Sequence, residues 1–175
     1  MFLAVHVVLV EPEIAPNTGN IIRLCAITGA ELHLVEPLGF ELSDRLLKRG
    51  GLDYHERANV TVHPDLESVA NRLTGRWFAF SSRSTKPFGD VRFTQSDVLV
   101  FGAERSGLSE EVLGRFAEDQ RLTIPMRPGN RSLNLANAAA IVVYEAWRQH
   151  GYEGATLDGL TSLTSETPGA APFDP

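Results

Sequence analysis

The chain has little of what disulfide-bonded, membrane-bound or exported proteins depend on. Its 175 residues contain a single cysteine, Cys25, so an internal disulfide is excluded and a reducing compartment is indicated. The longest apolar stretches, such as residues 138–143, are far too short to cross a bilayer. The first residues include no basic segment and no small-residue cleavage site, so we expect no export signal. We therefore expect a cytoplasmic protein with no membrane segment.

Motifs of metal and nucleophile chemistry are also missing. The histidines are scattered along the chain: His6, His33, His55, His63 and His150. Their spacing matches no metal-ligand motif, so we expect no metal site. There is no Gly-x-Ser-x-Gly elbow and no RNP-type aromatic motif. Cys25 lies in an apolar run, which favours a small buried residue over a catalytic thiol.

The charge balance is acidic overall, but the arginines are not spread evenly. The net charge is −6, with 43% hydrophobic and 22% charged residues, as in an ordinary globular domain. Nucleic acids are bound by local basic patches rather than by mean charge, so a polyanionic partner is not excluded. Four arginines lie in or beside loops rich in Gly, Asn and Pro: Arg23, Arg105, Arg127 and Arg131.

Strand-like and helix-like patterns alternate through most of the chain. Apolar, β-branched runs predict strands over residues 4–10, 32–35, 59–63, 77–80, 98–101 and 122–124. Between them we expect helices over 17–27, 64–73, 109–116 and 134–150, with a short basic helix opening at Ser43. This alternation predicts an α/β fold with a mainly parallel sheet and helices on both faces. We expect one domain over residues 1–153 and a flexible tail over 154–175, which is rich in Thr, Ser, Pro, Gly and Ala.

Parallel sheets bind ligands at the carboxyl ends of their strands, and the loop after the first strand is a candidate. Asn17 and Thr18 predict the N-cap of a helix that ends before Gly29. The free N–H groups of such a terminus can hold a phosphate, and Arg23, about one turn beyond Asn20, can reach the same region. From this segment alone, a capped helix with one solvated arginine is the favoured interpretation.

A second candidate follows the strand at 98–101 and reads Gly102-x-Glu104-x-x-Gly107-Leu108. Its glycines let the backbone approach a ligand closely, and Glu104 can accept a hydrogen bond from a ribose or an amine. The pattern is neither a dinucleotide-binding Gly-x-Gly-x-x-Gly nor a P-loop. A simple strand–helix turn with an exposed Glu–Arg pair is an equally good interpretation of this segment by itself.

The third candidate is the polar loop over residues 124–138, which precedes an alanine-rich helix. A helix needs one N-cap, and Ser132 or Asn134 is enough to supply it. Asn130 and Asn137 add further polar groups to the same short stretch. This surplus favours a binding loop.

Taken in order, these segments resemble the SPOUT superfamily of methyltransferases, and within it the SpoU (TrmH-like) branch. The resemblance covers residues 5–153 and is greatest to members that methylate the ribose at the tRNA wobble position. Its motifs are Glu11-Pro12-Glu13-Ile14-x-Pro16-Asn17-Thr18-Gly19-Asn20-Ile21-Ile22-Arg23-Leu24-Cys25-Ala26, Gly51-Leu52-Asp53-Tyr54-His55-Glu56, Phe101-Gly102-x-Glu104-x-x-Gly107-Leu108, Ile124-Pro125-Met126, Arg131-Ser132-x-Asn134-Leu135 and Val143-Tyr144-Glu145-Ala146-Trp147-Arg148-Gln149.

The resemblance implies a fold, a cofactor and a reaction. The fold would be α/β with a C-terminal trefoil knot, whose loops hold S-adenosyl-L-methionine in a bent conformation and release S-adenosyl-L-homocysteine. The protein would be a homodimer that transfers a methyl group to the ribose 2′-oxygen of a tRNA anticodon stem-loop, with no metal. The implied catalytic residues are Arg23, Asn20, Ser132 and Tyr144. The implied cofactor-binding residues are Phe80, Gly102, Glu104, Ile124, Met126, Ser132, Leu133 and Asn134.

Two alternatives stay open from the sequence. A related 2′-O-methyltransferase acting on another tRNA or rRNA site would carry the same motifs. A non-catalytic RNA-binding relative would keep the fold, although the presence of Arg23, Glu104, Ser132 and Asn134 argues against it.

Overall fold

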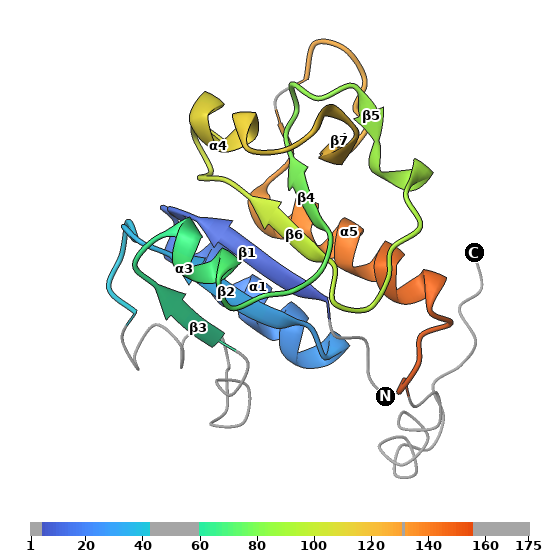
Figure 1. The fold of residues 1–175 in the computed structure, drawn as a ribbon, viewed down its shortest axis with the longest axis horizontal. Helices are drawn as coiled ribbons and strands as arrows, with labels where there is room; N and C mark the ends of the chain where they lie inside the picture. The colour runs from blue at the N-terminus through green and yellow to red at the C-terminus, as the bar shows by residue number, and fades with distance from the viewer. Residues whose placement is uncertain (1–4, 43–59, 131, 156–175) are drawn as a thin grey trace, which may run out of the picture.

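A seven-stranded parallel sheet forms the centre of the protein (Figure 1). The computed structural model describes residues 5–42, 60–130 and 132–155. The strand order is β3-β2-β1-β6-β4-β7-β5, and each neighbouring pair runs parallel, which confirms the predicted α/β fold. The strands are β1 (His6–Val10), β2 (Glu31–Val35), β3 (Val60–His63), β4 (Trp77–Phe80), β5 (Lys86–Pro87), β6 (Val98–Phe101) and β7 (Arg121–Thr123).

Helices cover both faces of this sheet. They are α1 (Ala15–Thr28), α3 (Leu66–Ala70), α4 (Glu110–Gly114) and α5 (Leu135–Gln149), with 3-10 turns η2 (Phe88–Asp90) and η3 (Glu118–Gln120). Successive side chains of a strand point to opposite faces. In β1, Val7 and Leu9 therefore join one buried cluster with α1 and α5, whereas Val8 and Val10 join another with α3 and α4. The sheet thus separates two hydrophobic cores.

Helix α1 begins two residues earlier than the sequence indicated. Ile14 is its N-cap and makes no side-chain capping bond, so the prediction that Asn17 and Thr18 form the cap was wrong. The physical reason is Pro16, whose fixed φ and missing N–H suit the first turn of a helix. Gly29 ends the helix in the left-handed conformation with φ 78°, as predicted.

The remaining elements differ from expectation mainly at their ends. Helices α3 and α4 stop at Ala70 and Gly114, earlier than predicted, although Asp65 and Ser109 cap them with side-chain acceptors. Strand β7 is shifted one residue towards the N-terminus relative to the prediction. Strand β5 was not predicted, because two residues are too few to show a periodicity.

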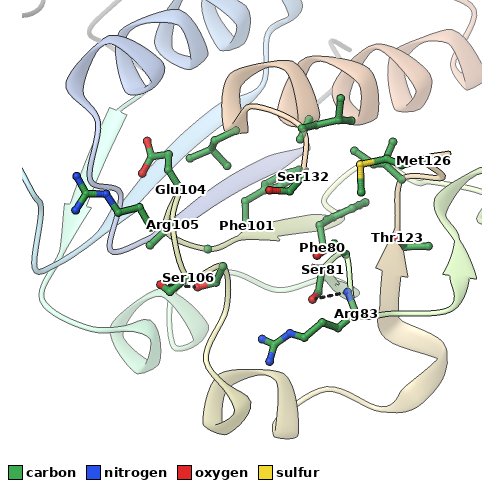
Figure 2. A pocket seen from close by; sticks show the side chains of 18 residues that line it. Phe80, Ser81, Arg83, Phe101, Glu104, Arg105, Ser106, Thr123, Met126 and Ser132 are labelled. Atoms are coloured by element: carbon green, nitrogen blue, oxygen red, sulfur yellow. Dashed lines mark hydrogen bonds between the residues drawn. The ribbon is translucent and has the colours of Figure 1, made fainter. Parts of the chain in front are cut away.

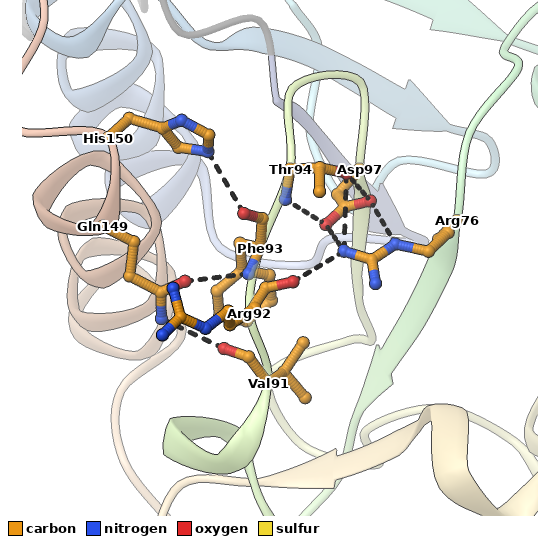
Figure 3. Close-up of polar contacts among 8 residues, drawn as sticks. All are labelled: Arg76, Val91, Arg92, Phe93, Thr94, Asp97, Gln149 and His150. Atoms are coloured by element: carbon orange, nitrogen blue, oxygen red, sulfur yellow. Dashed lines mark hydrogen bonds and ion pairs between the residues drawn. The ribbon is translucent and has the colours of Figure 1, made fainter.

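The C-terminal end of α5 is fastened to the segment before β6 (Figure 3). The Gln149 side chain donates to the Val91 carbonyl at 3.0 Å and accepts from the Phe93 amide at 2.8 Å. The imidazole of His150 binds the Phe93 carbonyl at 3.1 Å. The same segment is held by Arg76, the residue before β4, which pairs at 2.7 Å with the buried Asp97 carboxylate. These bonds satisfy backbone groups of a connection that has no strand partner of its own.

Three histidines form a diagonal row across β1, β2 and β3. His6 Nδ1 lies 3.2 Å from His33 Nε2, and His33 Nδ1 lies 3.0 Å from His63 Nε2. His33 and His63 are buried, and His6 is nearly so. Burial lowers the pKa of His33 to about 4, with smaller contributions from His6, His63 and Arg72. His33 is therefore neutral at neutral pH.

Several predictions fall outside the described residues. These are the short basic helix at Ser43, the motif at residues 51–56, Arg131 and the tail beyond residue 155. The division into a domain over 1–153 and a flexible tail stays a prediction, as does the trefoil knot. Among the helices of the described ranges, none is long and apolar enough to cross a membrane.

Candidate active site

A cavity opens at the carboxyl ends of β4, β6 and β7 (Figure 2). This is the edge at which parallel sheets bind ligands, because the loops that follow the strands meet there. The lining residues are Phe80, Ser81, Ser82, Arg83, Phe101, Gly102, Ala103, Glu104, Arg105, Ser106, Gly107, Thr123, Ile124, Met126, Ser132, Leu133, Leu135 and Ala138. All three of the loops that follow these strands contribute to it.

The turn after β6 is folded tightly back on itself at one side of the cavity. Ala103 and Gly107 form an isolated antiparallel bridge, in which the Gly107 amide donates to the Ala103 carbonyl at 2.8 Å. Gly107 has φ +67°, a conformation that glycine adopts without strain. A Cβ at Gly102 would overlap the backbone of Gly107 and Leu108. Both glycines are therefore required by this turn.

Apolar side chains form the opposite wall. The rings of Phe80 and Phe101 stack with their centroids 4.7 Å apart and their planes 13° from parallel. Met126 and Leu133, at 37% and 39% exposure, present large apolar groups to this opening. Apolar surface combined with a few polar groups in a concave site is typical of a small-molecule pocket.

Glu104 holds the start of α1 against this turn. Its carboxylate accepts hydrogen bonds from the Glu13 amide at 2.7 Å, the Ile14 amide at 3.2 Å and the Asn17 side chain at 3.0 Å. In return, Glu13 accepts from the Arg105 amide at 3.1 Å. A helix N-terminus leaves its first N–H groups without partners, and an anionic acceptor there is favourable. Glu104 thus supplies the acceptor near the start of α1 that Ile14 cannot.

Asn17 extends this contact to the third loop. Its side-chain oxygen accepts from the Asn134 amide group at 2.9 Å. The Asn134 oxygen caps α5 by accepting from the amides of Ala136 at 2.9 Å and Asn137 at 3.3 Å. A continuous polar chain therefore runs from Glu104 through Asn17 and Asn134 to α5. This polar chain connects the cavity to α1 and α5, which cover the same face of the sheet.

The predicted cofactor-binding residues come together in the structure. Seven of them line the cavity: Phe80, Gly102, Glu104, Ile124, Met126, Ser132 and Leu133. Asn134 lies beside it and is bonded to Asn17. Of the predicted catalytic residues, Ser132 lines the cavity, whereas Asn20, Arg23 and Tyr144 are exposed on α1 and α5 outside its lining. Tyr144 stacks edge-on against Trp147 with ring centroids 5.6 Å apart.

Several residues of this region were not among the predicted site residues, including Ser81, Arg83, Phe101 and Asn17. Arg83 lies three residues after the end of β4, donates to the Leu108 carbonyl at 2.6 Å and pairs with Glu110. Its place just after a strand was a usable signal, as it was for Ser81. Asn17 was taken for a helix cap, because its partners lie 87 and 117 residues away in the sequence.

Comparisons with known proteins agree with this arrangement. A tRNA (cytidine(34)-2'-O)-methyltransferase of Burkholderia pseudomallei is 58% identical over 152 residues, which cover 85% of this chain and 97% of that protein. A solved structure that addresses the 2-OH methylation of C/U34 on tRNA is 44% identical, with a TM-score of 0.78 over 86% of this chain and 98% of the other. The SpoU methyltransferase AviRb of Streptomyces viridochromogenes, in complex with AdoMet, is 27% identical, with a TM-score of 0.73 over 89% of this chain and 60% of the other.

The family model described as "SpoU rRNA Methylase family" matches residues 4–144, which include β1, the turn after β6 and most of α5. The chain therefore belongs to the SpoU methylase family.

Proposed function

We propose that the protein transfers a methyl group from S-adenosyl-L-methionine to the ribose 2′-oxygen of cytidine or modified uridine at tRNA position 34. The observation that carries this proposal is that residues of the second and third sequence motifs line one shared cavity together with Phe80. The relatives that act on position 34 match nearly their whole length to this chain, which supports the same substrate. We further propose that the enzyme works in the cytoplasm, where its tRNA substrate is found.

The cavity suits an adenosyl cofactor in shape and chemistry. Apolar groups of Phe80, Ile124, Met126 and Leu133 would hold the flat base, and the close turn at Gly102 would present backbone groups to it. Bound there, the cofactor supplies a methyl group on a positively charged sulfur, which a ribose oxygen can attack. The protein's task is to place that oxygen and to stabilise the charge that develops on it.

We propose that Arg23 orients the phosphate next to the target ribose, with Asn20, Ser132 and Tyr144 placing the sugar. Arginine stays protonated at neutral pH and is a poor base, but its planar fork binds phosphate with two parallel hydrogen bonds. Asn20 and Arg23 lie three residues apart on α1, so their side chains share one face of the helix. Exposed Arg105 at the cavity adds positive charge for the anticodon stem-loop.

We also propose a homodimer that uses the outer faces of α1 and α5. These helices pack together, and they expose Ile27, Ile141 and Tyr144 at 59%, 40% and 43%. Exposed apolar groups on neighbouring helices are typical of an interface between identical subunits. This arrangement would bring Arg23 and Tyr144 close to the subunit boundary. Light scattering should give twice the chain mass for the wild type and a monomer for the double variant Ile27→Asp, Ile141→Asp.

The reaction is tested by methyl transfer from radiolabelled S-adenosyl-L-methionine to bulk tRNA from a strain that lacks the gene, with nuclease mapping of the label. Label on the ribose of position 34 is the expected result. Label at another tRNA or rRNA ribose would favour the related methyltransferase and overturn the position. Neither transfer nor cofactor binding would favour the non-catalytic RNA-binding relative.

The role of Arg23 is tested by steady-state kinetics of Arg23→Lys. Lysine keeps the charge but cannot form the bidentate contact, so we expect kcat to fall at least about tenfold. Arg115→Lys is the matched control, because Arg115 is the C-cap residue of α4 and pairs with Glu111, and its turnover should match the wild type. Near-wild-type turnover of Arg23→Lys would exclude the bidentate contact.

A further inference from the structure

Three potential metal ligands lie together at the end of the sheet where β1 and β2 begin, away from the cavity. His6 and Glu31 are the first residues of β1 and β2 and lie directly opposite each other in the ladder. His33 is two residues after Glu31, so its side chain points to the same face of the sheet. One atom from each residue, His6 Nδ1, His33 Nε2 and Glu31 Oε2, lies within 4.8 Å of the other two.

The spacing of these atoms matches a zinc coordination sphere. His6 Nδ1 and His33 Nε2 are 3.2 Å apart, and Glu31 Oε2 lies 3.4 Å from the first and 3.9 Å from the second. Ligand atoms around a tetrahedral zinc ion, with bonds of about 2.0–2.1 Å, are separated by about 3.3–3.4 Å. We propose that His6, His33 and Glu31 bind one divalent transition-metal ion of the Zn²⁺ type, with water at the fourth position.

The surroundings orient the central ligand. His33 Nδ1 is bonded to His63 Nε2 at 3.0 Å, so the second nitrogen of the His33 ring is engaged and its Nε2 is directed at the site. Metal-binding histidines generally have such a partner on the far ring nitrogen, because it fixes the tautomer and the ring plane. His33 is 1% exposed and cannot swing away. The site is therefore largely organised before any ion arrives.

An ion can enter through Glu31, whose side chain is 51% exposed, whereas His6 is 13% exposed. The ligand set of two neutral imidazoles and one carboxylate is one that Zn²⁺ uses in proteins. Arg72 lies close enough to disfavour positive charge at His33 and His63, so it opposes the cation. We therefore expect reversible binding that a chelator removes, and tighter binding in Arg72→Gln.

This site would join the starts of two neighbouring strands, so its effect is on stability. The cavity is at the opposite, carboxyl edge of the sheet. The ion would take no part in methyl transfer, so metal binding and methyl transfer can be tested separately. It departs from the expectation of no metal site, which rested on scattered histidines that match no metal-ligand motif.

The test is calorimetric titration of Zn²⁺ into the untagged, chelator-treated full-length protein, with Co²⁺ absorption as a spectroscopic probe. We expect one saturable equivalent per chain for the wild type and a tetrahedral Co²⁺ spectrum. Glu31→Gln and His6→Gln should weaken Zn²⁺ binding at least about tenfold, since each removes a ligand. Glu67→Gln and His150→Gln are the matched controls and should bind as the wild type does.

Thermal unfolding gives a second readout, because a ligand that binds the native state raises its melting temperature. At the same Zn²⁺ concentration, the Tm of the wild type and both controls should rise clearly more than that of Glu31→Gln. Absence of saturable binding would overturn the proposal and leave a hydrogen-bonded histidine row. Binding that is unchanged in Glu31→Gln and His6→Gln would place the ion elsewhere and overturn it as well.

Discussion

Replacing Glu104 by alanine should destabilise the fold well beyond the loss of an ordinary surface glutamate. The change removes the acceptor of the Glu13 and Ile14 amides and of the Asn17 side chain. A hydrogen bond to a charged group contributes about 1.5–3 kcal/mol when its partners are shielded from water. Asn17 is 7% exposed, whereas Ile14 is 40% exposed and can bond to water instead. If the hydrogen bond from Asn17 is counted in full and those from the Glu13 and Ile14 amides in part, the loss of stability is about 3 kcal/mol.

The assay is urea unfolding followed by tryptophan fluorescence and circular dichroism, at one protein concentration for all variants because association shifts apparent stability. A loss of about 3 kcal/mol corresponds to a Tm lowered by about 6–12 °C for a domain of this size. Glu104→Gln keeps one acceptor oxygen and should lose about 1–2 kcal/mol. Glu111→Ala is the matched control, because its side chain is 80% exposed and its pair with Arg115 should contribute under about 0.5 kcal/mol.

The result that would refute this reasoning is a Glu104→Ala variant no less stable than Glu111→Ala. In that case the start of α1 would hold its position without the carboxylate. A large loss for Glu104→Ala with an unchanged denaturant slope is the expected outcome. Because α1 also carries Arg23, we expect the same variant to lose methyl transfer.

Three further predictions follow from individual residues. Burial raises the pKa of the Cys25 thiol to about 12, so the thiol should stay unreactive towards a disulfide reagent in the native protein and react fully in urea. Rapid labelling of Cys25 in the native protein would contradict this. Gly102→Ala should lose at least about 2 kcal/mol of stability and its cofactor binding, because the added Cβ would overlap the Gly107 backbone. In the control Gly114→Ala the added Cβ meets no atom, so unfolding and binding assays should show a neutral or stabilising change. Hydrogen bonds from Arg148 and Gln149 lower the pKa of Glu145 from 4.5 to about 2, so the stabilisation from this carboxylate is present above pH 4.5 and is lost as the pH falls towards 2. The difference in unfolding free energy between the wild type and Glu145→Gln should shrink over that range. A constant difference would show that these hydrogen bonds do not hold the carboxylate.

The order of strands and helices could be predicted because it follows from local patterns. Residues 98–101 are apolar throughout, as a strand buried on both faces must be, and the structure places β6 near the middle of the sheet. Gly29 marked the end of α1 because a left-handed residue there is most easily a glycine. The polar surplus around Ser132 and Asn134 indicated a binding loop, and this loop reaches the cavity.

Contacts between distant segments could not be predicted in this way. Asn17 has the residue type of a cap but lies inside the first turn of α1, and the approach of Glu104 and Asn134 gives its side chain its partners. The histidine row depends on the parallel register of β1, β2 and β3, which no local pattern determines. Strand β5 forms because β7 offers an edge to Lys86 and Pro87, not because of its own sequence.

The central claim is methylation of one ribose oxygen, and a pair of synthetic anticodon stem-loops tests it most directly. One RNA carries an ordinary ribose at position 34, and the other carries a 2′-deoxyribose there and is otherwise identical. With radiolabelled S-adenosyl-L-methionine, we predict stoichiometric labelling of the first RNA and none of the second. Equal labelling of both RNAs, or of neither, would contradict the assignment.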